Sequence, residues 1–164
     1  MDVREFASKP FDIFNKGWAL VTAGSRDSFN TMTVSWGSMG TLWNKPIVTV
    51  YVKPVRYTSE FLTREDYFTV SMYGSEYRKA LSLLGSKSGK DSDKVAESGL
   101  TPVFLENGVT FAEAKWTFVC KKIYASPFVP ELVPEFAHEA YYTDEEEHII
   151  FIGEVVDLIE EKKL

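Results

Sequence analysis

The pattern of apolar and polar residues along the chain predicts a protein built mainly from β-strands. The clearest strand covers residues 47–52, where almost every side chain is β-branched or aromatic. The last long apolar segment, 148–159, contains Gly153, and a glycine inside a strand indicates a bulge or a bend. In chain order, the predicted strands cover residues 18–23, 30–36, 47–52, 67–72, 110–125 and 148–159.

Short helices separate these strands. Apolar residues recur at helical spacing in 76–84 before Gly85 ends the pattern, and Thr58 is a suitable N-cap for a helix over 58–63. Residues 94–98 predict one helical turn and 130–140 a partly helical segment, whereas 1–17, 37–46 and the polar surface loop 86–93 are irregular. The strands do not alternate with long helices, which disfavours a doubly wound parallel sheet. We expect a single domain, residues 1–164, in which about six antiparallel strands close into a mainly β barrel with short peripheral helices.

Small hydroxyl residues alternate with larger ones in the stretch 31–40. Alternate residues of a strand share a face, so Thr31, Thr33 and Ser35 lie on one side and Met32, Val34 and Trp36 on the other. Gly37 and Gly40 allow the backbone to approach a neighbour closely. The stretch is either an ordinary amphipathic strand followed by a glycine turn or a surface that receives a planar ligand.

The segment 53–58 places two cations and a hydroxyl where a strand passes into a helix. The first amides of a helix bind anions, Arg56 can form a bidentate clamp, Lys53 adds a point charge and Thr58 a donor. This combination suits a phosphate monoester. The alternative is a pair of exposed cations beside a turn.

Composition narrows the function further. The net charge of −6 disfavours nucleic-acid binding, which needs a basic surface. Cys120 is the only cysteine and, with His138 and His148, cannot build a metal cluster, so we expect no metal, a buried thiol and a reducing, cytoplasmic setting. Residues 1–10 do not form a signal peptide, and no apolar run approaches the ~20 residues of a membrane span.

Three consecutive motifs carry a family resemblance: Asn-Thr-Met-Thr-Val-Ser-Trp-Gly at 30–37, Pro-Ile-Val-Thr-Val-Tyr-Val at 46–52, and Lys-Pro-Val-Arg-Tyr-Thr-Ser-Glu-Phe at 53–61. With the segments 88–94 and 148–155, they make the chain resemble the flavin reductase-like family from about residue 18 to 157. That family has the FMN-binding split-barrel fold and includes flavoredoxins.

The resemblance implies FMN, held at the interface of a homodimer. It places the isoalloxazine ring against 31–36 and the ribityl phosphate against 53–58. The segment with Lys90 and Lys94 is either a solvated surface loop or a lid or dimer contact that supplies a further cation. The residues implied for the cofactor are Thr31, Met32, Thr33, Val34, Ser35, Trp36, Lys53, Arg56, Tyr57, Thr58 and Lys94.

The function implied is an FMN-binding oxidoreductase that moves hydride or electrons between NADH or NADPH and flavin or a downstream acceptor. The alternatives are a flavoredoxin-type electron carrier with a redox protein partner and a non-enzymatic FMN-binding module. No Gly-x-Gly-x-x-Gly fingerprint is present, but the family does not use a Rossmann domain. The flavin carries the chemistry, and the protein supplies orientation and electrostatics.

His148 is the one candidate for the substrate side. The family commonly has Gly-Asp-His where this chain has Glu146-Glu147-His148. The residue either contacts the substrate or is an exposed residue at the start of a strand. If it is functional, the adjacent carboxylates favour its protonated form.

Overall fold

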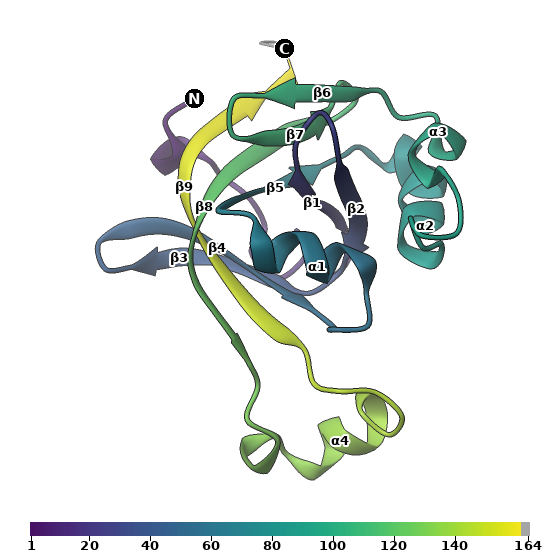
Figure 1. The fold of residues 1–164 in the computed structure, drawn as a ribbon. Helices are drawn as coiled ribbons and strands as arrows, with labels where there is room; N and C mark the ends of the chain where they lie inside the picture. Colours follow the sequence, from purple (N-terminus) through teal and green to yellow (C-terminus); the bar gives the residue numbers. More distant parts are fainter. Residues whose placement is uncertain (162–164) are drawn as a thin grey trace.

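The computed structural model describes residues 1–161 and contains a seven-stranded antiparallel sheet and a separate two-stranded hairpin (Figure 1). The strands are β1 (Ala19–Gly24), β2 (Phe29–Val34), β3 (Gly37–Leu42), β4 (Lys45–Val52), β5 (Tyr67–Met72), β6 (Pro102–Leu105), β7 (Gly108–Phe111), β8 (Trp116–Pro127) and β9 (Ile149–Glu160). The α-helices are α1 (Tyr57–Arg64), α2 (Arg78–Ser86), α3 (Lys94–Ser98) and α4 (Glu135–Tyr141), with 3₁₀ turns η1 (Val3–Glu5), η2 (Ser75–Tyr77) and η3 (Pro130–Leu132). The prediction of a mainly antiparallel β protein with short helices is confirmed.

The strand order β2-β1-β5-β8-β9-β4-β3 explains why the sheet forms a barrel. β2 and β3 lie at opposite edges of the sheet, yet only Ser35 and Trp36 separate them in sequence. Two residues cannot bridge a flat sheet of this width, so the sheet must curl until its edges meet. The two edge strands do not pair with each other, and the barrel is therefore split at this point, which we call the seam.

The structure contains more strands than the six predicted. The segment 37–46 is not irregular but forms a hairpin whose turn residues, Trp43 and Asn44, have φ angles of 50° and 58°. Two positive φ angles in succession are typical of a type I′ turn, which follows the twist of its strands. The predicted strand 110–125 is two strands, β7 and β8, and β7 pairs with β6. Glycines and a proline obscured these strands in the sequence pattern.

Two apolar clusters hold the helices against the barrel. The barrel interior is filled by large side chains that include Phe68, Phe118 and Phe151. Outside it, Leu20 of β1 packs with Leu81 and Leu84 of α2 in a second cluster. This second cluster fixes the C-terminal end of α2, and the loop that follows it, beside β2.

A bulge interrupts the pairing of β8 and β9. Lys122 pairs with Gly153 and Tyr124 with Ile152, so the residue between Lys122 and Tyr124 has no partner in β9. The bulge adds bending and twist to the longest ribbon of the sheet. The predicted irregularity at Gly153 is confirmed.

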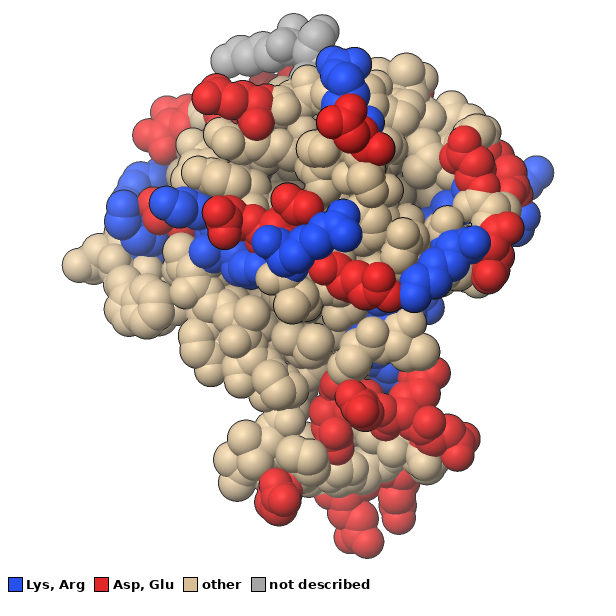
Figure 2. All heavy atoms as spheres, in the orientation of Figure 1, with Lys and Arg blue, Asp and Glu red and all other residues tan. Residues whose placement is uncertain are grey.

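β8 and β9 extend beyond the barrel and carry η3 and α4 at their far end (Figure 1). We call residues 128–148 the arm. Acidic side chains gather on this part of the molecule (Figure 2), and the apolar residues Leu132 and Phe136 are 81% and 70% exposed. The prediction of a partly helical segment at 130–140 is confirmed. In residues 1–161, no helix is long and apolar enough to cross a membrane.

Candidate functional site

A small hollow lies at the seam, formed mainly by backbone. Residues 32–36 line it together with Tyr51 of β4 and His148 of the arm, and its volume is about 170 Å³. β2 is an edge strand, so every second residue points its backbone N–H and C=O away from β1. We call this the seam hollow. Its free backbone groups and the half-exposed Trp36 suit a flat ligand with hydrogen-bonding edges.

The threonine side chains of β2 do not face this hollow. Thr31 is fully buried, and its Oγ1 lies 2.8 Å from Thr22 Oγ1 and donates to Val21 O at 3.2 Å. Thr33 Oγ1 donates to Leu81 O of α2 at 2.5 Å. These hydroxyls fasten β2 to its neighbours. A ligand at the seam therefore meets backbone groups of 32–34 rather than threonine hydroxyls. Thr31, which the resemblance implies for the cofactor, lines neither hollow.

A second hollow of about 240 Å³ lies at the start of α1. Val55–Thr58 and Ser86–Ser88 form its walls with Asn30, Met32, Lys94 and Glu145. The first amides of α1 have no intrahelical partners and carry the positive end of the helix dipole. We call this the anion hollow.

The N-cap of α1 is Arg56, two residues before the predicted Thr58, and it makes no side-chain cap bond. Its Nη2 donates to Gly85 O at 2.6 Å, which aligns the guanidinium along the wall of the anion hollow. Thr58 is buried, and its Oγ1 accepts a hydrogen bond from Asn30 Nδ2 at 2.8 Å. Asn30, which sequence reasoning did not select, thus ties β2 to α1 where both line the hollow.

Lys94 is a buried cation at the rear of the anion hollow. Its Nζ donates to Leu84 O at 3.0 Å and to Lys87 O at 2.9 Å, so it closes the C-terminal end of α2. Burial, and then the nearby Arg56 charge, lower the pKa of Lys94 to about 8. The predicted helical turn at 94–98 is confirmed as α3, and its first residue, Lys94, is only 3% exposed rather than solvated. An anion in the hollow would stabilise its charged form.

The two hollows are neighbours because Met32 lines both. One offers cations and helix amides, and the other offers free strand backbone and aromatic rings. A ligand with an anionic group at one end and a flat ring system at the other fits this arrangement. Within the described residues, no group of three or more His, Cys, Asp or Glu side chains could hold a metal ion.

Lys53 points to the arm. Its Nζ donates to Tyr141 O at 2.8 Å and forms an ion pair with Glu145 at 2.5 Å. The side chain is not part of the lining of the anion hollow, although Arg56 donates its backbone N–H to Lys53 O. Of the cations predicted for a phosphate, Arg56 and Lys94 are therefore brought together, and Lys53 is held beside them by the arm.

His148 lies between the arm and the seam. Its Nδ1 is 2.7 Å from the hydroxyl of Tyr142, and its ring lies 5.3 Å from that of Trp36. Burial, and then the Lys53 charge, lower the pKa of His148 to about 4, and Glu145 opposes both. The expectation of a protonated ring is wrong because burial outweighs the neighbouring carboxylates. The ring is neutral near pH 7.

This shift predicts a measurable acid sensitivity. The pKa of His148 is about 4 in the folded protein and about 6.5 in an unfolded chain. A group whose pKa is lower in the folded protein contributes its full stability when the pH is above the pKa of the unfolded chain. This stability is lost as the pH falls through the pKa of the folded protein. The free energy of unfolding of the wild type, compared with His148→Asn, should therefore decline between about pH 6.5 and pH 4. Urea unfolding at several pH values measures this difference, and a constant difference would contradict the assignment.

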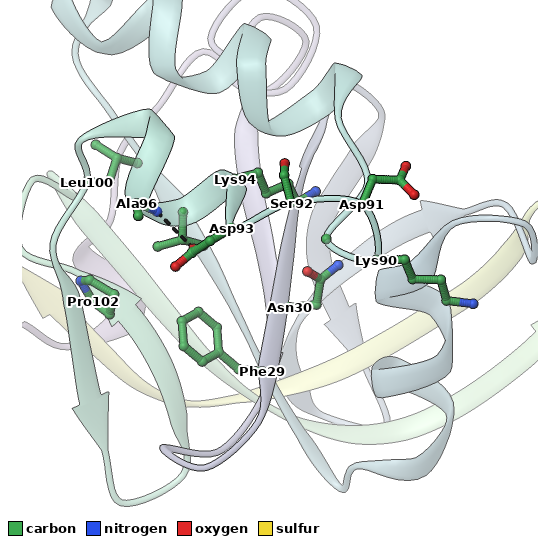
Figure 3. A pocket seen from close by; sticks show the side chains of 12 residues that line it. Phe29, Asn30, Lys90, Asp91, Ser92, Asp93, Lys94, Ala96, Leu100 and Pro102 are labelled. Carbon is green, nitrogen blue, oxygen red and sulfur yellow. Dashed lines mark hydrogen bonds between the residues drawn. The ribbon is translucent and has the colours of Figure 1, made fainter.

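A larger hollow of about 580 Å³ lies on the other side of Asn30 and Lys94. Figure 3 shows Phe29 and Asn30 directed into it from β2, with Ser92 and Asp93 above them and Lys90 pointing away. Lys90 forms an ion pair with Glu60 on the surface. Its lining combines apolar side chains with both acidic and basic ones, so no single sign of charge dominates.

Sequence reasoning missed Asn30, Tyr51, Ser86–Ser88, Tyr142 and Glu145. Asn30 and Tyr51 belong to predicted strands and lie within two residues of Thr31 and Lys53. The local sequence therefore indicated that both could lie beside the site. Ser86–Ser88 and the arm residues reach the site only through tertiary packing.

Cys120 is fully buried, as predicted, and burial raises the pKa of its thiol.

Solved structures with the same fold are flavoproteins. Flavoredoxin from Methanosarcina acetivorans matches at a TM-score of 0.71 and 21% identity, over 90% of this chain and 69% of the other. Flavoredoxin of Desulfovibrio vulgaris (Miyazaki F) matches at 0.69 and 25%, over 98% and 74%. The NADH:FAD oxidoreductase SgcE6 of Streptomyces globisporus C-1027, in complex with NAD and FAD fragments, matches at 0.66 and 20%, over 88% and 74%.

A comparison with curated protein sequences finds no significant match. The family model of the flavin reductase-like domain, in contrast, matches residues 11–164. That range includes the seam, the anion hollow and the arm. The protein belongs to the flavin reductase-like family and has its split-barrel fold.

Proposed function

We propose that this protein binds FMN and acts as an oxidoreductase that passes hydride or electrons from NADH or NADPH to flavin or a further acceptor. Membership of the flavin reductase-like family supports a flavin-related redox function. The observation that carries the proposal is the pair of adjacent hollows that share Met32. They match the two ends of FMN, a phosphate and a flat heterocycle.

In this proposal each hollow has its own part in binding. Arg56, Lys94, Thr58 and the first turn of α1 hold the phosphate in the anion hollow, and Tyr57 walls the same hollow. The backbone of 32–34, followed by Ser35 and Trp36, orients the ring at the seam. When bound, the flavin supplies the redox chemistry.

His148 occupies the open side of the seam hollow. A neutral imidazole there can donate or accept one hydrogen bond without adding charge next to the ring. The hydrogen bond between Tyr142 and Nδ1 leaves Nε2 for a ligand. We infer that His148 contacts the nicotinamide or the acceptor that approaches the ring from this side.

The redox proposal is tested by mixing the FMN-loaded protein with NADH or NADPH under anaerobic conditions. Bleaching of the visible flavin absorption by either nucleotide is expected. The rate with each gives the preference between them. A loaded protein that neither nucleotide bleaches would contradict the role as a nicotinamide-dependent reductase.

A second candidate is a flavoredoxin-type electron carrier. Acidic side chains gather on the arm (Figure 2), whose His148 lines the seam hollow, and they suit a basic patch on a redox protein partner. Slow reduction by both nucleotides, together with fast, salt-sensitive electron exchange with a basic redox protein, would favour this function. The non-enzymatic FMN-binding module predicts neither reaction.

We also infer a homodimer. The arm stands away from the barrel, and its exposed apolar side chains include Val129, Leu132 and Phe136, at 51%, 81% and 70% exposure. A second copy of the chain would bury them. Sedimentation of the wild type should give twice the chain mass of 18.6 kDa, and Leu132→Asp with Phe136→Asp should shift it towards the monomer. A monomeric wild type would contradict the inference.

A further inference from the structure

The anion hollow contains a carboxylate that a phosphate site does not need. Glu145, from the acidic turn 144–147 of the arm, lines the hollow together with Arg56 and Lys94. A negative charge at this position repels a phosphate. We propose that Glu145 competes with the ligand's phosphate for Lys53, which stands beside the hollow, and for the cations of the hollow, so that phosphate binding and attachment of the arm oppose each other. This inference rests on the proposed function.

Lys53 is the point where the competition takes place. It stands immediately after β4 and next to the turn that leads to α1. Its Nζ contacts three arm groups: Tyr141 O at 2.8 Å, Glu145 at 2.5 Å and the Tyr142 ring at 5.5 Å. One ammonium group thus binds both the C-terminal end of α4 and the acidic turn, and holds them against the barrel. A phosphate entering beside Arg56 offers the same ammonium a stronger anion than a single carboxylate.

The charges around Glu145 support its place in this network. The hydrogen bond from Lys53, and then its charge, lower the pKa of Glu145, and Arg56 and His148 act in the same direction. The carboxylate is therefore ionised at neutral pH and lies within the field of the hollow. His148 and Tyr142 stand on its other side, at the seam.

The competition connects the two hollows. The arm residues that Lys53 contacts also form the outer wall of the seam. Tyr141 packs edge-on against Trp36, and Tyr142 is hydrogen-bonded to His148. If phosphate weakens the bond between Lys53 and Glu145, it also loosens this wall. By linkage, if phosphate weakens attachment of the arm by a given factor, attachment of the arm weakens phosphate binding by the same factor.

The decisive variant is Glu145→Gln, which removes the charge and keeps the shape. Its dissociation constant for FMN should fall by about fivefold at low ionic strength, whereas riboflavin, which has no phosphate, should bind as it does to the wild type. Glu146→Gln is the matched control, because Glu146 carries the same charge one residue on and does not line the anion hollow. It should change both constants by less than about twofold. Salt should reduce the effect of Glu145→Gln.

Unchanged or weaker FMN binding in Glu145→Gln would overturn the inference, as would equal tightening in Glu146→Gln. If the wild type binds neither flavin, the proposed function fails, and the inference is then decided with inorganic phosphate. Thermal protection by phosphate should be larger in Glu145→Gln than in the wild type. Equal protection would overturn the competition independently of any flavin.

The link to the arm has its own readout. In the wild type, inorganic phosphate should speed amide hydrogen exchange in residues 135–147, because it draws Lys53 away from Glu145. In Glu145→Gln, exchange in this segment should be fast without phosphate and change little when phosphate is added. Identical exchange in the wild type with and without phosphate would show that the hollow and the arm are not coupled.

Discussion

Replacing Arg56 by alanine is expected to raise the dissociation constant for FMN by about 10- to 100-fold, since charge-assisted hydrogen bonds to a phosphate contribute about 1.5–3 kcal/mol. Arg56 is the guanidinium of the anion hollow and is aligned by its hydrogen bond to Gly85 O. Riboflavin lacks the phosphate, and its affinity should change by less than about threefold. Fluorescence titration with both flavins measures the two constants.

Arg64→Ala is the matched control. Arg64 is the last residue of the same helix, pairs with Glu65 on the surface and does not line the hollow. Its loss should leave both flavin affinities unchanged. Arg56→Lys should fall between the wild type and alanine, because lysine keeps the charge and loses the planar fork. Equal losses for FMN and riboflavin in Arg56→Ala would argue against a phosphate contact.

Replacing Gly153 by alanine should lower the free energy of unfolding by about 3 kcal/mol, because the added methyl group overpacks the barrel interior. A Cβ at this position would lie 2.5 Å from Cys120 Cβ and 2.7 Å from the Phe68 ring. Both neighbours are buried in the same cluster and cannot withdraw without moving β5 or β8. Urea unfolding measures the loss.

Gly40→Ala provides the comparison. Gly40 also lies in a strand, but a Cβ there would meet no atom within 4 Å. Its stability should stay within about 0.5 kcal/mol of the wild type or improve slightly, since alanine has less backbone entropy to lose. Similar losses in both variants would mean that strand propensity, rather than overpacking, sets the cost at Gly153.

Local patterns were sufficient to predict the strands that define the barrel. β-Branched and aromatic residues fill the segment 47–52 and make up the first four positions of 67–72, and these segments lie in β4 and β5. β3 was missed because Gly37–Leu42 has no strong propensity of its own and pairs only because the type I′ turn directs it against β4. Pairing of this kind is decided by tertiary context.

The candidate site was predictable where one stretch of chain supplies both the backbone and the charge. Residues 31–36 and 56–58 meet this condition and lie beside the two hollows. The position of Lys53 was not predictable, because its partner Glu145 is 92 residues away in sequence. The prediction of a protonated His148 was wrong for a related reason. The sequence shows the neighbouring carboxylates but not the burial that outweighs their effect on the pKa.

The central claim is that this chain binds FMN through the anion hollow and the seam hollow together. Titration of the purified, flavin-free protein with FMN and with riboflavin, followed by flavin and tryptophan fluorescence, tests it most directly. We predict saturable binding of both, with FMN at least about tenfold tighter because only FMN reaches Arg56 and Lys94. The absence of saturable binding, or equal affinity for the two flavins, would contradict the account.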